Sequence, residues 1–298
     1  MVGASLDPAN FSGRSADRTG WAALLIGTAI IAWSGIIVRF LDVGPLAGGA
    51  WRMGLATPAL ALWAGPVSGK RLALLDAVPH LGLVLLAGVA FAFDVGGFHI
   101  ALTGTKVANA TFIGNIAPIL AVVGGALFFR EHPPARVWFA LALALVGSWV
   151  MAGALAPARL NYGDLFALGA AAAYATYLLV IKRLRLHFDG PTATLWSAAV
   201  SAIVLATAAG VRGEILIPHS AGGWIAVFLL GFVSHALGQG MTSVAIGRLP
   251  VGLVALVILA QPPFSALIAL LVLGETMTVL QIIGGTMILV ATIAARPH

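Results

Sequence analysis

The sequence predicts an all-α integral membrane protein with ten transmembrane helices, arranged as two five-helix repeats of inverted topology around a central cavity. Three observations predict this fold class: an apolar composition, ten apolar stretches, and motifs that recur in both halves of the chain. Hydrophobic residues make up 60% of the 298 residues and charged residues only 9%, and the mean hydropathy is +1.04. Soluble globular domains carry about 25% charged residues, so the composition excludes a water-soluble protein.

The apolar stretches are each about 20 residues long, the length that an α-helix needs to cross roughly 30 Å of hydrocarbon. They cover residues 21–41, 45–63, 79–101, 107–129, 137–155, 163–181, 191–209, 222–245, 251–273 and 278–295. The connections between them are mostly shorter than about 15 residues, which leaves no room for a separate soluble domain. Any ligand is therefore expected to bind within the membrane or at its edges.

Motifs of the first half return in the second half at a nearly constant spacing, which marks an internal repeat. The pairs 144 positions apart include Val107 and Val251, Pro118 and Pro262, and Glu131 and Glu275, and those 143 apart include Gly20 and Gly163, Arg39 and Lys182, and Leu41 and Leu184. Each half holds five spans, an odd number, so homologous halves must enter the membrane in opposite directions, as is typical of secondary transporters. We expect a disordered cytoplasmic tail over 1–19 and repeats over 20–156 and 157–298.

The basic residues predict which side of the membrane each loop occupies, because Lys and Arg gather in cytoplasmic loops. On the side of the N-terminus lie Arg14, Arg18, Lys70, Arg71, Arg130, Arg136, Lys182, Arg183, Arg185, Arg248 and Arg296. The opposite side holds Arg39, Lys106, Arg159 and Arg212, and Arg52 lies within a span. We therefore expect both termini in the cytoplasm. The net charge of +6 then reflects topology and anionic lipid headgroups rather than binding of nucleic acid.

Several kinds of chemistry are excluded by what the chain lacks. It contains no cysteine, which rules out disulfides, thiolate metal sites and cysteine nucleophiles. The segment Gly65–Lys70 is close to a phosphate loop, but it has three residues rather than four between its glycines and no Ser or Thr after the lysine. No zinc-hydrolase or serine-hydrolase motif is present. We expect no cofactor and no metal ion.

Asp94 is the strongest candidate for a functional residue, because it lies about two-thirds of the way along the third span. An acidic group at that depth costs about 2.5–3.5 kcal/mol on insertion scales, which makes function the default hypothesis. It would bind a substrate ammonium group or carry a proton. The alternative is a buried structural pair with Arg52.

The eighth span places His235, Gln239 and Thr242 on one helical face. At the repeat spacing His235 corresponds to Phe91 of the third span, the span that carries Asp94. We expect Phe91, His235 and Gln239 to line the cavity. The alternative is hydrogen bonding between helices, a common use of polar side chains in membrane bundles.

Two spans carry prolines at matched mid-span positions, Pro118 in the fourth and Pro262 with Pro263 in the ninth. Proline frees a backbone carbonyl and kinks a helix, and interrupted spans at corresponding positions of two repeats point to a binding site. We expect the prolines to be gating kinks and Asn115 and Gln261, which stand just before them, to hydrogen-bond a substrate. A merely structural kink is the alternative.

The first span and its repeat counterpart, the sixth, carry aromatic and hydroxyl side chains deep in the membrane. These are Trp33 and Ser34 in the first span and Tyr174 and Tyr177 in the sixth. Trp33 and Tyr174 lie too deep for the aromatic belt of the membrane interface. They are candidates for stacking on a substrate, and core packing is the alternative.

Glu131 and Glu275 each end a span, where a carboxylate opposes the helix dipole. We therefore expect each of them to serve another purpose, either capping the next helix or pairing across the bundle.

The chain resembles the drug/metabolite transporter superfamily, in its EamA-type family, over about residues 20–295. The residues that carry the resemblance are Asn109–Pro118, Phe128–Glu131, Val257–Pro263, Leu271–Glu275 and the pair Trp51-Arg52. Within the family the chain looks most like the YddG-type bacterial exporters of aromatic and other amino acids. The resemblance implies a bacterial inner-membrane location, a basket of ten helices around a central cavity, and outward movement of amino acids.

On this basis we expect a secondary transporter that exports small metabolites, principally amino acids including aromatic ones, by alternating access. Ten spans are enough for a monomer to enclose a transport path. We therefore expect the partners to be the small-molecule substrate and membrane lipids. One alternative is a carrier of multiple drugs or of other metabolites such as nucleosides or sugars. Another is an intramembrane enzyme, for which Asp94 with His235 is the only imaginable constellation; the inverted repeat argues against it.

Overall fold

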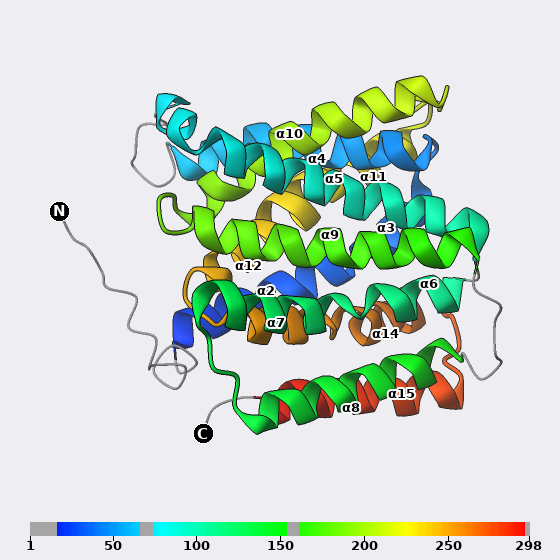
Figure 1. The fold of residues 1–298 in the computed structure, drawn as a ribbon. Coiled ribbons are helices and arrows are strands. Elements are labelled where there is room, and N and C mark those ends of the chain that lie inside the picture. The colour runs from blue at the N-terminus through cyan, green and yellow to red at the C-terminus, as the bar shows by residue number, and fades with distance from the viewer. Residues whose placement is uncertain (1–16, 66–73, 106, 154–160, 296–298) are drawn as a thin grey trace.

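The computed structural model describes residues 17–65, 74–105, 107–153 and 161–295, and every regular element in these ranges is a helix (Figure 1). The helices of the first half are α2 (Arg18–Ala32), α3 (Ser34–Ile37), η1 (Val38–Phe40), α4 (Pro45–Ala64), η3 (Leu74–His80), α5 (Leu81–Gly104), α6 (Val107–Gly114), α7 (Ala117–Phe129) and α8 (Ala135–Ala152). Those of the second half are α9 (Tyr162–Leu184), α10 (Gly190–Val211), α11 (Ala221–Phe228), η4 (Leu229–Gln239), α12 (Gly240–Ile246), α13 (Val251–Ile258), α14 (Gln261–Leu273) and α15 (Val279–Ala294). Most of the predicted tail and the predicted boundary between the repeats lie outside the described residues.

Each of the predicted apolar stretches falls on a helix or on consecutive helices. Among the described residues, seven segments are long and apolar enough to cross a membrane: Arg18–Phe40, Ala77–Gly104, Asn109–Phe129, Tyr162–Leu184, Gly190–Val211, Ala221–Ile246 and Val251–Leu273. Two further apolar helices, Ala135–Met151 and Val279–Ala294, are shorter. The all-α membrane fold is therefore confirmed, and a crossing by α4 and by the two shorter helices stays a prediction.

Capping side chains fix where the first helix of each half begins. Asp17 accepts a hydrogen bond from the backbone N–H of Gly20 at 2.7 Å, so α2 begins at Arg18, inside the tail predicted over 1–19. Asn161 accepts from the N–H of Asp164 at 3.2 Å, and the Asp164 carboxylate accepts from the N–H of Asn161 at 3.0 Å. These caps satisfy backbone donors that have no partner within the helix. Asp17 and Asn161 are 144 positions apart, so the two halves begin alike.

Helices from the two halves pack against each other throughout the bundle. α8 lies beside α15 at one edge, α4 packs against α10 at the opposite edge, and α9 runs through the middle beside α5 (Figure 1). α8 and α15 approach closely because both carry glycine at the contact: a Cβ atom on Gly284 would lie 2.3 Å from the carbonyl oxygen of Gly147. Small residues of this kind let membrane helices pack backbone to backbone. The halves thus form one bundle rather than two separate domains.

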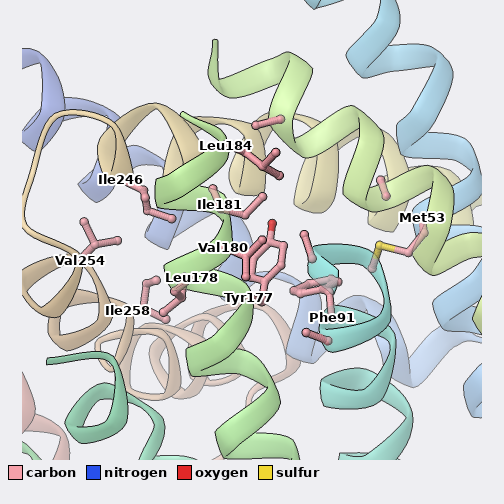
Figure 2. Close-up of a cluster of buried hydrophobic side chains, with 14 of the residues drawn as sticks. Met53, Phe91, Tyr177, Leu178, Val180, Ile181, Leu184, Ile246, Val254 and Ile258 are labelled. Atoms are coloured by element: carbon pink, nitrogen blue, oxygen red, sulfur yellow. The ribbon is translucent and has the colours of Figure 1, made fainter. Parts of the chain in front are cut away.

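The largest cluster of buried apolar side chains lies in the centre of the bundle and is built around α9 (Figure 2). Leu178, Ile181 and Leu184 of α9 belong to the same cluster as Ile246 of α12 and Val254 of α13, and all five are at most 1% exposed. Lipid tails are as apolar as these side chains, so close van der Waals packing, rather than removal from water, holds the cluster together. We call it the central cluster; the five residues named above lie toward the end of the bundle where α9 finishes, and other members extend along α4, α5 and α10.

Candidate functional site

A cavity of about 540 Å³ lies between helices of both halves. Its lining comes from α2, α3, η1, α4, α5, α6, α7, α9, η4, α13 and α14 and from the breaks within two spans. Val38 and Leu102 line it at the end of the bundle where η1 and α5 finish, and Ile258 belongs both to the lining and to the central cluster. The cavity therefore extends from the middle of the bundle toward one end, and buried members of the central cluster, including Ile246 and Val254, close the other. Its volume is typical of small-molecule sites.

Two side chains of opposite charge face this cavity. Arg52 of α4 and Asp94 of α5 both line it and are partly buried. They act on each other electrostatically, yet no hydrogen bond and no ion pair within 4.0 Å joins them among the described residues. The Nε atom of Arg52 is buried without a hydrogen-bond partner. Both groups therefore keep bonding capacity for a ligand, which distinguishes them from a closed structural pair.

Aromatic side chains gather beside these charges. The Phe91 ring lies 4.5 Å from the Tyr177 ring, 6.4 Å from the Tyr174 ring and 5.4 Å from the His235 ring, measured between centroids. The rings of Tyr174 and Tyr177 are stacked at 6.1 Å. Phe91 and Tyr174 line the cavity, whereas Tyr177 is fully buried and supports them from behind. The cluster presents apolar ring faces to whatever occupies the cavity.

The span that faces this cluster from the second half is not a regular α-helix. Its central segment η4 is an 11-residue π-helix, a rare conformation that is frequent at functional sites. Gln239 ends η4, lines the cavity and donates a hydrogen bond to the Tyr177 hydroxyl at 3.3 Å. His235 is fully buried, does not line the cavity, and has no hydrogen-bond partner at either ring nitrogen. A buried polar group without a partner is costly and calls for an explanation.

Both proline-bearing spans are interrupted at the predicted places. α6 ends and α7 begins around Asn115, and α13 ends and α14 begins just before Gln261. Pro118 and Pro262 are the second residues of α7 and α14 and line the cavity, together with Asn115 and Gln261. Asn115 also donates a hydrogen bond to the Ser148 hydroxyl of α8. Pro263 is buried outside the lining.

Most of the candidate residues thus converge on one cavity, but some do not. The lining includes Ser34, Phe91, Asp94, Asn115, Pro118, Tyr174, Gln239, Gln261 and Pro262. Tyr177, His235 and Pro263 stand behind it, and Trp33 is 44% exposed and outside it. Trp33 lies between α2 and α3, next to Ser34, which does line the cavity. Their roles in binding or gating stay predictions.

Other lining residues were not singled out in the sequence. Arg52 was considered only in the alternative, as a structural partner of Asp94, but it faces the cavity itself. Phe98 and Leu102 also line the cavity and share one face of α5 with Phe91 and Asp94, at helical spacings of three, four and seven residues. Extending that face from Asp94 in both directions would have identified them.

A family model, the EamA-like transporter family, matches the chain twice, over residues 18–153 and 161–295. The chain is 26% identical to a "Probable terminal-alkyne amino-acid exporter" of Streptantibioticus cattleyicolor, over 90% of this chain and 89% of that protein. It is 27% identical to an "Uncharacterized transporter" of Archaeoglobus fulgidus, over 71% of this chain and 75% of that protein.

Two further proteins are similar, one over a shorter part of the chain and one in its fold. The threonine/homoserine exporter RhtA of Salmonella typhimurium is 27% identical over 57% of each protein. A crystal structure superimposes with a TM-score of 0.77, covers 92% of this chain and 98% of its own, and is 20% identical, which shows the fold alone. Because the family model covers both halves of the chain, with the interrupted spans and the cavity between them, the chain belongs to the EamA-like transporter family, within the drug/metabolite transporter superfamily.

Proposed function

We propose that the chain is a secondary exporter of amino acids, which it binds in the 540 Å³ cavity and carries by alternating access. Membership of a transporter family makes it a transporter rather than an enzyme. The main support for amino acids as substrates is the pair Arg52 and Asp94. Their opposite charges face one cavity and are not joined directly. A free amino acid carries the complementary carboxylate and ammonium groups.

In the proposed complex each end of the amino acid meets the group of opposite charge. The Arg52 guanidinium donates to the substrate carboxylate, a geometry that allows two parallel hydrogen bonds. The Asp94 carboxylate accepts from the substrate ammonium group. Asn115, Gln239 and Gln261 line the same cavity and offer neutral hydrogen bonds to the remaining polar atoms.

The substrate side chain then packs on ring faces. Phe91, Phe98 and Tyr174 line the cavity beside the charges, and such surfaces accept aliphatic and aromatic groups alike. The names of two relatives, one a probable terminal-alkyne amino-acid exporter and the other a threonine/homoserine exporter, support the same substrate class. The resemblance to YddG-type exporters favours including aromatic amino acids.

The transport cycle that we propose uses the repeat. The chain would cross the membrane ten times as two inverted five-helix repeats, 20–156 and 157–298, with both termini in the cytoplasm. The double match of the family model and the equivalent breaks before Pro118 and Pro262 support this arrangement. In this orientation, which the distribution of basic residues favours, the open end of the cavity would face outward and the closed end, where α9 finishes, would face the cytoplasm. Inverted repeats allow two such states to exchange around one central site.

The test is counterflow into proteoliposomes that hold the purified protein and are preloaded with an unlabelled amino acid. We expect radiolabelled threonine, methionine, phenylalanine or tryptophan to accumulate above the level of empty vesicles. Tryptamine, which lacks the carboxylate, and phenylpropionate, which lacks the ammonium group, should compete poorly. No accumulation of any of the twenty amino acids by folded protein would refute the proposal.

The rival carrier of multiple drugs or of other metabolites is less well supported by the cavity. A site for lipophilic cations needs an excess of acidic groups, and the charge of Asp94 is balanced by Arg52 in the same lining. Nucleosides and sugars carry no opposite charges at their two ends. Competition by these compounds in the counterflow assay, in place of amino acids, would favour the rival.

A further inference from the structure

Two ion pairs join the halves of the chain at opposite ends of the bundle. Lys182 at the end of α9 pairs with Glu131, which follows α7. Arg39 in η1 pairs with Glu275, which follows α14. By sequence Arg39 corresponds to Lys182, and Glu131 corresponds to Glu275. Each pair is therefore the other pair with the two halves exchanged.

The two glutamates are presented by the same local structure. The C-cap residue of α7 is Arg130, with φ of 51°, and that of α14 is Gly274, with φ of 68°. The next N–H in each case turns back onto the helix: that of Glu131 donates to the Gly125 carbonyl at 3.2 Å and that of Glu275 to the Ala269 carbonyl at 3.3 Å. This left-handed C-terminal turn fixes both carboxylates in equivalent positions, so the difference between the pairs lies in what surrounds them.

The Lys182–Glu131 pair is enclosed by the beginning of α13. Its side chains are only 7% and 9% exposed. Glu131 also accepts from the N–H of Val251 at 3.1 Å, which places its charge on the positive end of α13. Lys182 donates to the carbonyl of Leu249 at 3.1 Å. A carboxylate, a cation and a helix N-terminus thus close this end of the bundle, next to the central cluster.

The Arg39–Glu275 pair consists of the repeat-equivalent residues, but no helix in the described part of the chain encloses it. Its side chains are 51% and 48% exposed. The repeat counterpart of Val251 is Val107, the first residue of α6. α13 packs against α7, whereas the equivalent helices α6 and α14 make no comparable contact among the described residues. This open pair lies at the end of the bundle that the cavity reaches.

We infer that these pairs are two alternating gates of one transport cycle, an inference that rests on the alternating access proposed above. The Lys182–Glu131 pair, docked on α13, holds the cytoplasmic end shut in the present state. In the opposite state α6 docks on Glu275 and buries the Arg39–Glu275 pair, while α13 leaves Glu131. Each step replaces one enclosed ion pair by its equivalent, so neither state leaves a buried charge without a partner.

The absence of cysteine lets a single introduced thiol report on each end of the full-length protein. Val254→Cys, in the central cluster and 0% exposed, reports on the cytoplasmic end. Val38→Cys, which lines the cavity and is 43% exposed, reports on the other end. The measurement is the rate at which each thiol reacts with a water-soluble maleimide in reconstituted membranes, with and without L-threonine, L-methionine, L-phenylalanine and L-tryptophan.

The gates predict opposite effects for equivalent substitutions. Glu131→Gln should raise labelling at position 254 and lower it at 38, and Glu275→Gln should do the reverse. We expect about tenfold changes, which correspond to about 1.4 kcal/mol in the equilibrium between the states. Arg183→Gln removes one charge from the exposed neighbour of Lys182 and should change neither rate. If Glu131→Gln does not fold, Arg39→Gln and Glu275→Gln alter only an exposed pair and carry the test.

A merely structural role predicts almost no effect of Glu275→Gln, because that pair is half exposed in the present state. The gate proposal is refuted if Glu275→Gln leaves the labelling rates at positions 254 and 38 unchanged. It is also refuted if both glutamate variants change these rates in the same direction. If wild-type labelling at 254 and 38 still moves in opposite directions with amino acids, alternating access stands without these gates. If the wild-type reporters never move in opposite directions, alternating access and the gates fail together.

Discussion

α5 and its repeat counterpart, the span α11–η4–α12, are the clearest contrast between the two halves. α5 is α-helical from Leu81 to Gly104, whereas the counterpart carries an 11-residue π-helical segment. At the spacing of 144 positions, Asp94 of α5 corresponds to Gly238, and Phe91 corresponds to His235. The first half therefore places a charge where the second half has no side chain.

The contrast teaches that the scaffold is repeated but the site is not. Arg52 and Asp94, the two charged groups proposed to bind the substrate, both come from the first half, and the second half adds neutral Gln239 and Gln261 to the same lining. A repeated scaffold suits the proposed cycle between two states in which the halves exchange conformations. A substrate with two unlike ends needs an asymmetric site, and the unequal residues of α5 and its counterpart supply one.

Replacing Asp94, whose counterpart in the second half is a glycine, should have the largest effect. Asp94→Asn removes the proposed partner of the substrate ammonium group, and a hydrogen bond to a charged group contributes about 1.5–3 kcal/mol. We expect amino-acid counterflow to fall about 10- to 100-fold. Asp17→Asn, the same chemical change just before α2 and outside the cavity lining, is the matched control and should leave the rate unchanged. An Asp94→Asn protein that transports at the wild-type rate would remove Asp94 from the site.

The counterpart position tests why the second half has no side chain there. A Cβ atom on Gly238 would lie 2.7 Å from Cγ1 of Ile31 and 3.1 Å from Cγ2 of Ile30, on the facing α2. Gly238→Ala should therefore lower the free energy of unfolding by about 1–3 kcal/mol, as overpacking does elsewhere. The measurement is the thermal midpoint in detergent micelles.

Gly210→Ala is the control for this substitution, because a Cβ atom there meets nothing within 4 Å. It should raise the midpoint slightly, since alanine favours a helix more than glycine does. Equal midpoints for the two variants would show that α2 and η4 can separate at no cost, and the steric explanation of Gly238 would fail.

The same spans show how far the sequence could predict the molecule. The positions of the helices and the breaks before Pro118 and Pro262 followed from apolar length and from proline chemistry, which are local properties. The depth of Asp94 followed from counting along a span. The side of a helix that faces the cavity is harder to predict, because lipid-facing and protein-facing surfaces are both apolar. Hence Trp33 was expected in the site and lies outside the lining. Arg52 was considered only as an alternative structural partner of Asp94, yet it lies in the lining.

The π-helix of η4 could not be predicted for a related reason. His235 and Gln239 were placed on one face by α-helical spacing, and both are indeed buried. Only Gln239 reaches the cavity. The wider turn of η4 depends on how α2 and α4 pack around it, and these contacts join residues far apart in the chain.

His235 allows a test of whether the second half holds a functional group behind the cavity. His235→Phe copies the equivalent Phe91 and removes two buried ring nitrogens that have no partner. Replacing an unsatisfied polar group by an apolar one of similar shape should raise the free energy of unfolding by about 1 kcal/mol. We expect counterflow to slow at the same time, because a costly group retained beside a substrate cavity is explained by function.

Thr28→Val is the matched control for His235→Phe. The Thr28 hydroxyl is also buried without a partner, and its residue is fully buried outside the lining. This variant should gain stability and transport at the wild-type rate. Wild-type transport by His235→Phe as well would mean that His235 is dispensable and that the contrast between α5 and its counterpart concerns folding only.

The smallest effect is expected at the caps that open the two halves. The hydrogen bond from the Gly20 N–H, and with it Arg248, lowers the pKa of Asp17 below its ordinary 3.8, against an opposing effect of burial. A lowered pKa means that Asp17 stabilises the fold above about pH 3.8 and that this contribution is lost as the pH falls through its folded value. The equivalent cap, Asn161, does not titrate. At the N-cap position itself, only the first half should therefore have an acid-sensitive side chain.

Asp17→Asn isolates this difference, because asparagine caps a helix about as well as aspartate and all other carboxylates are common to both proteins. At neutral pH the two proteins should differ by only a few tenths of a kcal/mol, the loss of an exposed charge at a helix N-terminus. On acidification the thermal midpoint of the wild type should fall further than that of Asp17→Asn. Parallel curves would contradict the lowered pKa, and the two caps would then be equivalent in chemistry as well as in position.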